Sequence, residues 1–147
     1  MCGFVVWYNS RCNVYAKELL KASALQSHRG PDNNNSIFFD KKLKKNNLSN
    51  KKNLIGFSHH RLSIIDLSNL SNQPMISKNE RYTFVYNGEI YDFDNLRKKL
   101  HEKGYNFTSK GDTEVLMNFL IENYNNYKKI NDLDGMWSFV LFDKKKK

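Results

Sequence analysis

The chain begins with the stretch Met1-Cys2-Gly3-Phe4-Val5-Val6-Trp7-Tyr8. Residues 3–8 are a near-continuous apolar run, which at this length predicts a strand covered on both faces. Cys2 directly follows the initiator methionine, so removal of Met1 would leave a thiol and a free α-amine on one residue. The ordinary pKa of a thiol is about 8.5 and that of an α-amine is about 8. Because the two values are so close, the amine can act as the base for its own thiol. The stretch alone leaves two interpretations open: a nucleophile, or a small residue ahead of a buried strand.

The composition is typical of one globular domain. The chain has 147 residues, of which 39% are hydrophobic and 14% aromatic, and this length allows a sizeable core. The sequence contains neither an apolar run of about 18 residues nor the pattern of a secretory signal. We therefore expect a cytoplasmic protein with no membrane partner. Two cysteines, Cys2 and Cys12, are too few for a disulfide framework, and we expect both to be free thiols.

The net charge of +9 comes largely from two lysine-rich runs. One run lies within residues 41–52, and the other is residues 144–147. Asparagines and a serine separate the lysines of the first run, without the aromatic residues of a base-stacking platform. This pattern indicates solvated segments, and we expect no nucleic-acid partner.

Hydrophobic periodicity predicts helices interspersed with strands, and this order indicates a layered α+β domain. Residues 63–73 are expected to form a loop, and Asn87-Gly88 is expected to end a strand with a turn. The expected strands are residues 3–8, 36–39, 54–62, 82–86 and 136–142, and the second and third of these form a hairpin. The expected helices are residues 15–27, capped by Asn13, a helix from Asp92 to Gly104, and a third helix after Gly111-Asp112.

Several polar residues at expected element ends are suited to binding a zwitterionic amino acid. Arg61 could hold a carboxylate through its planar guanidinium, although an arginine at a strand end is more often solvated or ion-paired. Asn87 and Gly88 could donate N–H groups to a developing oxyanion, although Asn-Gly more often marks only a turn. Glu89 and Asp112 could hold an ammonium group, whereas the simpler interpretation of Asp112 is a helix N-cap.

Other chemistries have no matching pattern in the sequence. Neither paired carboxylates for sugar hydrolysis nor a glycine-rich phosphate loop with its lysine is evident. The histidines lack paired ligand spacing and cysteine neighbours, so we expect no metal site and structural roles for His28, His59, His60 and His101.

Seven short blocks occur in one order along nearly the whole chain. Together they resemble the glutaminase domain of glutamine-hydrolysing asparagine synthetases, which belong to the N-terminal-nucleophile amidotransferases, and their joint occurrence is highly specific. The blocks are Cys2-Gly3, His28-Arg29-Gly30-Pro31-Asp32, His60-Arg61-Leu62-Ser63-Ile64-Ile65-Asp66, Gln73-Pro74-Met75, Asn87-Gly88-Glu89-Ile90-Tyr91, Gly111-Asp112-Thr113-Glu114 and Leu133-Asp134-Gly135-Met136-Trp137-Ser138-Phe139.

The resemblance implies both a fold and a reaction. The implied fold is a four-layer αββα sandwich of the N-terminal-nucleophile hydrolase type. In the implied reaction, processed Cys2 attacks the side-chain amide of glutamine, ammonia leaves, and a glutamyl thioester is hydrolysed to glutamate. The implied site consists of Cys2 as nucleophile, Asn87 and Gly88 as oxyanion hole, Arg61 with the backbone of Leu62, Ser63, Ile64 and Ile65 for the substrate α-carboxylate, and Glu89 and Asp112 for its α-ammonium.

In the family, the chain continues past the strand that matches residues 136–142, through a further strand and into an ATP-using synthetase domain. This sequence stops at Lys147. We therefore expect residues 1–147 to be a glutaminase domain truncated at its C-terminus, with residues 136–142 lacking a neighbouring strand and prone to aggregation. No cofactor is expected for the glutaminase step, since ATP and Mg²⁺ would serve only the absent synthetase domain. The expected partners are glutamine and a separate synthetase domain or chain.

Three functions remain open at this point. The leading one is a glutaminase that forms the N-terminal part of an asparagine synthetase. A second is a truncated, non-catalytic remnant or interaction module. A third is another N-terminal-nucleophile amide hydrolase, although the pairing of Arg61 with Asp112 favours glutamine over acylated substrates.

Overall fold

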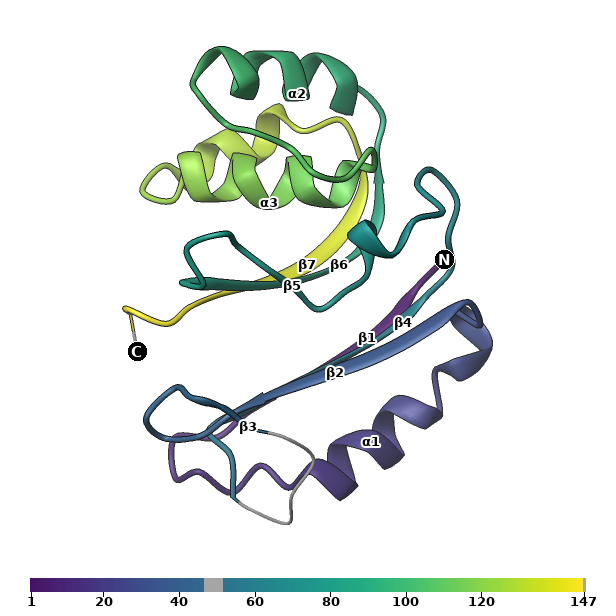
Figure 1. Cartoon of the computed structure of the whole chain (residues 1–147), viewed down its shortest axis with the longest axis vertical. Helices are drawn as coiled ribbons and strands as arrows, with labels where there is room; N and C mark the ends of the chain where they lie inside the picture. The colour runs from purple at the N-terminus through teal and green to yellow at the C-terminus, as the bar shows by residue number, and fades with distance from the viewer. Residues whose placement is uncertain (47–51, 147) are drawn as a thin grey trace.

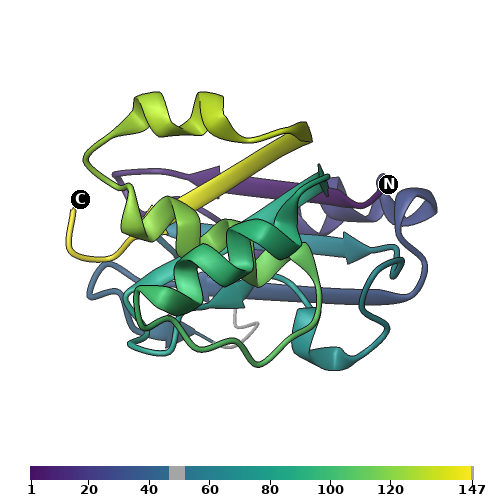
Figure 2. The same ribbon diagram turned by 90° about the horizontal axis from the view of Figure 1, so that it is seen from above.

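The computed structural model describes residues 1–46 and 52–146, so part of the lysine-rich hairpin tip and Lys147 lie outside the described residues. The chain forms four layers, in the order helix, sheet, sheet and helix pair (Figure 1). Viewed from above, the helix pair lies over the strands (Figure 2). The predicted αββα sandwich is therefore confirmed.

Both sheets are antiparallel. In the first, β1 (Gly3–Tyr8) and β2 (Asn33–Phe39) flank the central strand β4 (Ile55–Arg61), and β3 (Lys45–Asn46) pairs with β2. In the second, β6 (Tyr82–Ile90) lies between β5 (Met75–Ile76) and β7 (Gly135–Asp143). The helices are α1 (Ala16–Ala24), α2 (Phe93–Glu102) and α3 (Asp112–Glu122), with short 3₁₀ turns η1 (Ser27–Arg29), η2 (Asn69–Ser71) and η3 (Tyr127–Asp132).

The core is divided among the interfaces between these layers. Phe57 and Val85 are fully buried between the two sheets, Leu19 and Phe38 are buried between α1 and the first sheet, and Leu116 is buried under the second helical layer. Because side chains alternate along a strand, β1 and β2 each contribute to two of these interfaces. This explains the near-continuous apolar run at residues 3–8, which was predicted to be covered on both faces.

Helix ends were predicted less well than helix positions. α1 begins at Ala16 after Tyr15, and no side chain caps it, so the predicted Asn13 cap is wrong. Asp92 occupies the N-cap position of α2, but its side chain accepts a hydrogen bond from the Asn95 side chain and not from the helix backbone. Asp112 is the first residue of α3, and the cap position belongs to Gly111.

The predicted turn at Asn87-Gly88 is also wrong, because β6 continues through both residues to Ile90. The whole of this continuation is paired with β7, with Gly88 opposite Trp137. Gly88 has a φ of +154°, and a Cβ there would lie 2.1 Å from the carbonyl oxygen of Met136. Glycine at this position therefore permits a close approach of β7 and does not end the strand.

β7 is an edge strand among the described residues, since β6 is its only partner there. Its first half is the more exposed part, and Met136 is 63% exposed. The expected tendency of this edge to aggregate stays a prediction. Within residues 1–46 and 52–146, none of the helices has the length and apolar character needed to cross a membrane.

Candidate active site

A pocket of about 130 Å³ lies beside the start of the chain, with Met1 and Cys2 among its lining residues. A cavity of roughly 150 Å³ holds one benzene ring, so this pocket suits one small molecule rather than a polymer. Both sheets, the loop after β4 and the start of α3 contribute to its wall. The lining residues are Met1, Cys2, Arg61, Leu62, Ile64, Ile65, Asp66, Ser71, Gln73, Tyr86, Asn87, Gly88, Glu89, Gly111, Asp112, Thr113 and Met136.

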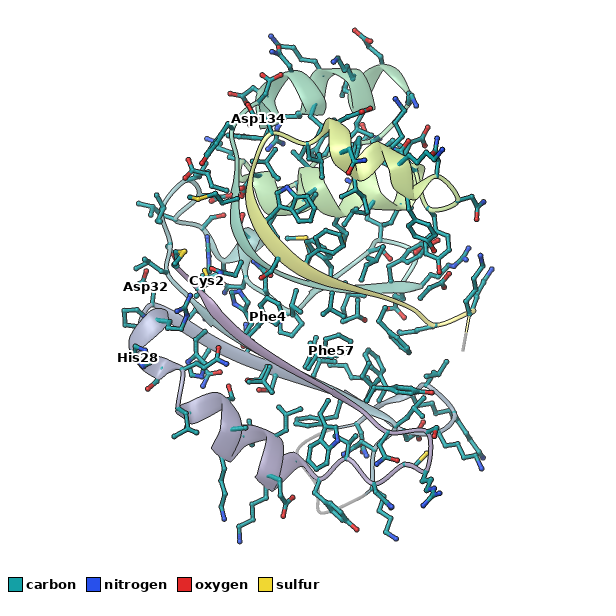
Figure 3. The ribbon with its side chains drawn as sticks, turned by 180° about the vertical axis from the view of Figure 1, so that it is seen from behind. Cys2, Phe4, His28, Asp32, Phe57 and Asp134 are labelled. Atoms are coloured by element: carbon teal, nitrogen blue, oxygen red, sulfur yellow. The ribbon has the colours of Figure 1, made fainter. Side chains whose placement is uncertain are left out.

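The Cys2 thiol is fixed against the residue that follows β4. Its Sγ accepts a hydrogen bond from the Leu62 N–H at 3.3 Å and lies 3.6 Å from the Leu62 carbonyl oxygen. The Cys2 carbonyl oxygen accepts from Arg29 Nε at 3.0 Å, so the backbone is also anchored. Figure 3 shows Cys2 at the same end of the sandwich as Asp32, with Phe4 further into the space between the sheets. Met1, which is 67% exposed, precedes Cys2 and lines the pocket.

Arg61 is a buried cation with neutral hydrogen-bond partners. Its side chain donates to the Ser68 carbonyl and the Asn72 side-chain oxygen, each at 2.7 Å, and to the Asp66 carbonyl. The residue is 6% exposed, and among the described ion pairs none involves it. The alternative interpretation of Arg61, as a solvated or ion-paired residue, therefore does not hold among the described residues. A buried charge without a counter-ion is unfavourable, so the guanidinium is suited to an anionic ligand.

Asp66 was not predicted as a site residue, yet it organises the loop around Arg61. Its carboxylate accepts hydrogen bonds from Ser68 N–H at 2.8 Å, Lys110 N–H at 2.7 Å and the Ser71 hydroxyl at 2.8 Å. Burial raises the pKa of Asp66, but these hydrogen bonds outweigh it and hold the pKa well below the usual range. Asp66 thus joins the loop after β4 to the segment that leads into Asp112. An Asp two residues before a Ser is compatible with a local turn, but the contact with Lys110 has no sequence signal.

Asp112 presents a carboxylate to the pocket from the first turn of α3. Its Oδ2 accepts from the Tyr86 hydroxyl at 2.9 Å and from the Ile90 N–H at 3.2 Å. Burial raises the pKa of Asp112, and the hydrogen bonds from Tyr86 and Ile90 act in the opposite direction. Burial also raises the pKa of Tyr86, as does the neighbouring Asp112 charge, so the hydroxyl stays a donor. The alternative role of Asp112 as only an N-cap is wrong.

Asn87, Gly88 and Glu89 follow Tyr86 along β6 and also line the pocket. Within the described part of the chain, the Asn87 side-chain amide has no hydrogen-bond partner, which leaves both of its N–H groups available to a ligand. Glu89 is exposed, and its charge raises the pKa of both Tyr86 and Asp112. Glu89 and Asp112 therefore both add negative charge to this part of the pocket.

Nine of the ten predicted site residues line this one pocket, and Ser63 does not. The Ser63 N–H donates to Asp32 Oδ2 at 2.7 Å, so it is not free to help bind a carboxylate. Sequence reasoning missed Gln73, Thr113 and Met136 as lining residues. All three lie within the blocks that carry the family resemblance, but only their packing in three dimensions assigns them to the pocket. Among the described residues, no three His, Cys, Asp or Glu side chains are grouped as metal ligands.

Comparison with protein families matches residues 1–147 to a model described as a glutamine amidotransferase domain. Among curated proteins, the chain is 36% identical over 150 residues to asparagine synthetase [glutamine-hydrolyzing] 1 of Bacillus subtilis, covering 98% of this chain and 21% of that protein. It is 31% identical over 130 residues to asparagine synthetase B [glutamine-hydrolyzing] of Escherichia coli, covering 88% of this chain and 20% of that protein. The chain thus spans about a fifth of the length of these relatives.

Among solved structures, the chain resembles glutamine phosphoribosylpyrophosphate amidotransferase from B. subtilis. The TM-score is 0.68 with 20% sequence identity, and the match covers 98% of this chain and 35% of that one. At this identity the likeness concerns the fold, and it agrees with the four layers described above.

Proposed function

The chain belongs to the glutamine amidotransferase family, as a domain homologous to the N-terminal part of asparagine synthetases, and we propose that it hydrolyses glutamine to glutamate and ammonia with Cys2 as the nucleophile. One observation carries this proposal. A thiol, a buried guanidinium with no ion-pair partner among the described residues, and a buried carboxylate line a single pocket of small-molecule size; they belong to Cys2, Arg61 and Asp112.

The charges of the pocket match those of a free α-amino acid. Of the five N–H donors of Arg61, three donate to oxygens of the described residues, and the other two could donate to an α-carboxylate. Asp112, with Glu89 nearby, supplies the negative charge for an α-ammonium group. An amide whose amino group is acylated would leave the buried Asp112 charge without a cation to pair with, which is unfavourable. We therefore favour glutamine over the acylated substrates of other N-terminal-nucleophile hydrolases.

The proposed chemistry begins with removal of Met1, which converts the Cys2 nitrogen from an amide to an amine. The amine takes the thiol proton while Sγ attacks the side-chain amide carbon of glutamine. The Asn87 side chain and the Gly88 N–H donate to the oxyanion of the tetrahedral intermediate. The protonated amine then gives its proton to the departing nitrogen, which leaves as ammonia. Water attacks the remaining thioester with the amine again as base, and glutamate is released with regeneration of the thiol.

The fate of the ammonia is a further part of the proposal. Since the curated relatives are named asparagine synthetases and are about five times as long as the match, we propose that a synthetase domain or chain accepts it. That step would use ATP and Mg²⁺, whereas the glutaminase step needs no cofactor. Two free cysteines in the chain suit a reducing compartment, and we propose a cytoplasmic location.

The test is glutamate release from glutamine by the methionine-processed chain. We expect turnover by the wild type, none by Cys2→Ala, and wild-type turnover by Cys12→Ala, which removes the other free thiol. Retention of Met1 should abolish turnover because the base would then be an amide nitrogen. A wild-type rate no higher than that of Cys2→Ala would refute the activity, and equal rates with and without Met1 would refute the N-terminal mechanism.

A further inference from the structure

On the edge of β6 opposite β7, the backbone of Tyr86 is held by side chains instead of by a neighbouring strand, while Phe139 of β7 pairs with Tyr86 on the other edge. β5 contains two residues, so among the described strands β6 has no partner on that edge at Tyr86. Gln73 Oε1 accepts the Tyr86 N–H at 2.6 Å, and His59 Nε2 lies 3.1 Å from the Tyr86 carbonyl oxygen. Together with the contact between the Tyr86 hydroxyl and Asp112, this fixes the residue at three points.

The contact with Tyr86 sets the tautomer of His59. A carbonyl oxygen only accepts hydrogen bonds, so Nε2 must carry the proton and Nδ1 has only a lone pair in the neutral ring. His59 has no exposed surface, and its Nδ1 has no partner among the described residues. Burial is the main cause that lowers the pKa of His59, to about 4, so the ring is neutral near pH 7.

The same contact joins the two sheets beside the pocket. His59 is in β4, two residues before Arg61, and Tyr86 is in β6, one residue before Asn87. Among the hydrogen bonds of the described residues, the bond between His59 and Tyr86 is the only one that links a strand of the first sheet to a strand of the second. Cys2 contacts the residue after β4, whereas Asn87 and its neighbours belong to β6. The bond therefore helps to fix the position of the half of the pocket that contains Cys2 relative to the half that contains Asn87.

We propose that His59 is a positioning residue for glutamine hydrolysis, whose Nε2–H bond to the Tyr86 carbonyl holds Asn87 and Gly88 where they can meet the oxyanion formed at Cys2. This inference rests on the proposed function. Oxyanion donors act only when they are correctly placed in the transition state, and a displacement of about 1 Å can slow a reaction about 100-fold. Loss of the bond should therefore lower kcat more than it raises KM, because Arg61 keeps its hydrogen bonds to Ser68 and Asn72 and Asp112 belongs to α3.

Two amide variants test the inference. In His59→Gln, the side chain is long enough to place an N–H near the position of Nε2, whereas the His59→Asn side chain is one methylene shorter. Glutamate release should be measured well below the melting temperature of each variant. We expect His59→Asn to lower kcat at least about tenfold with KM within about threefold, and His59→Gln to restore most of kcat. A wild-type kcat in folded His59→Asn, or an equal loss in both variants, would overturn the inference.

A wild-type chain without turnover would refute the proposed function but would not decide the role of His59. In that case the amide resonance of Gly88, followed by NMR in the full chain, gives the answer. A shifted Gly88 resonance in His59→Asn, with a wild-type position in His59→Gln, supports the positioning role. An unchanged Gly88 resonance in His59→Asn overturns it.

Discussion

Acidification from about pH 7.5 to pH 5 should destabilise the folded chain through His59. Burial lowers the pKa of this ring to about 4 from an ordinary value of 6.5, the hydrogen bond to Tyr86 opposes the shift, and the charges of Arg61 and His60 add to it. Between these two pKa values the unfolded chain binds a proton that the folded chain excludes. Stability is therefore full above about pH 6.5 and is lost as the pH falls towards 4.

The magnitude follows from the two pKa values. At pH 5 the unfolded histidine is almost fully protonated and the folded one is about one-tenth protonated, which corresponds to a loss of about 2 kcal/mol relative to pH 7.5. With a typical denaturant dependence of about 2 kcal/mol per molar urea, the unfolding midpoint should fall by about 1 M. Asp66, whose pKa is lowered in the fold, loses its contribution only below about pH 4 and so does not account for this change.

Urea unfolding of the wild type and of His59→Gln at both pH values isolates the effect. Glutamine does not titrate, so the variant should lose about 2 kcal/mol less stability than the wild type over the same interval. Asp112, whose raised pKa makes acid favour the folded state, contributes equally to both proteins and cancels in the difference. Parallel pH dependences for the two proteins would refute the assignment of the acid sensitivity to His59.

Three further predictions concern the pocket and two salt bridges, Arg81–Asp143 and Lys103–Glu122. Asp112→Asn should weaken glutamine binding about 10- to 100-fold and reduce the preference for glutamine over N-acetylglutamine; an unchanged preference would count against the ammonium contact. Cys2→Ala should bind glutamine without turnover, so glutamine at about 100 times its Kd should stabilise the folded variant by about 2.7 kcal/mol. No rise in melting temperature with glutamine, or an equal rise with N-acetylglutamine, would contradict binding of a free amino acid at this pocket. Asp143→Asn should lower the melting temperature more than Lys103→Met, because the Asp143 side chain paired with Arg81 is 2% exposed while the Lys103 side chain is 56% exposed; equal melting temperatures would contradict this ranking.

Local sequence patterns predicted those strands and helices that depend mainly on the hydrophobic periodicity of their own residues. The apolar run of residues 3–8 became β1, and the helical periodicity after Asp92 and Gly111 became α2 and α3. The turn predicted at Asn87-Gly88 failed because its true partner is β7, about 50 residues later in the chain. Asn-Gly is a turn signal only where no distant strand completes the ladder, and nothing within residues 82–90 reveals such a strand.

The residues of the candidate site likewise fall into a group that the sequence predicted and a group that it did not. The chemistry of single residues made Arg61 and Asp112 candidates, and the family resemblance then favoured their binding roles over the simpler interpretations. The groups that hold them in place were missed, because Asp66, Tyr86 and His59 act through contacts with residues 44, 26 and 27 positions away, respectively. Sequence motifs therefore identified which groups could bind a substrate, whereas only the fold identified which groups orient them.

The charge arrangement of the pocket links stability to function. The fold buries the Arg61 cation without a counter-ion among the described residues and buries the Asp112 carboxylate with only neutral donors. Either group would be less unfavourable if it had an ion partner within the protein. Mutual pairing of the two would satisfy both charges but would remove the separation that a zwitterionic ligand needs. The neutral contacts of Arg61 and Asp112 therefore hold the two charges apart, and under the proposed function an amino acid that carries both opposite charges would relieve both at once.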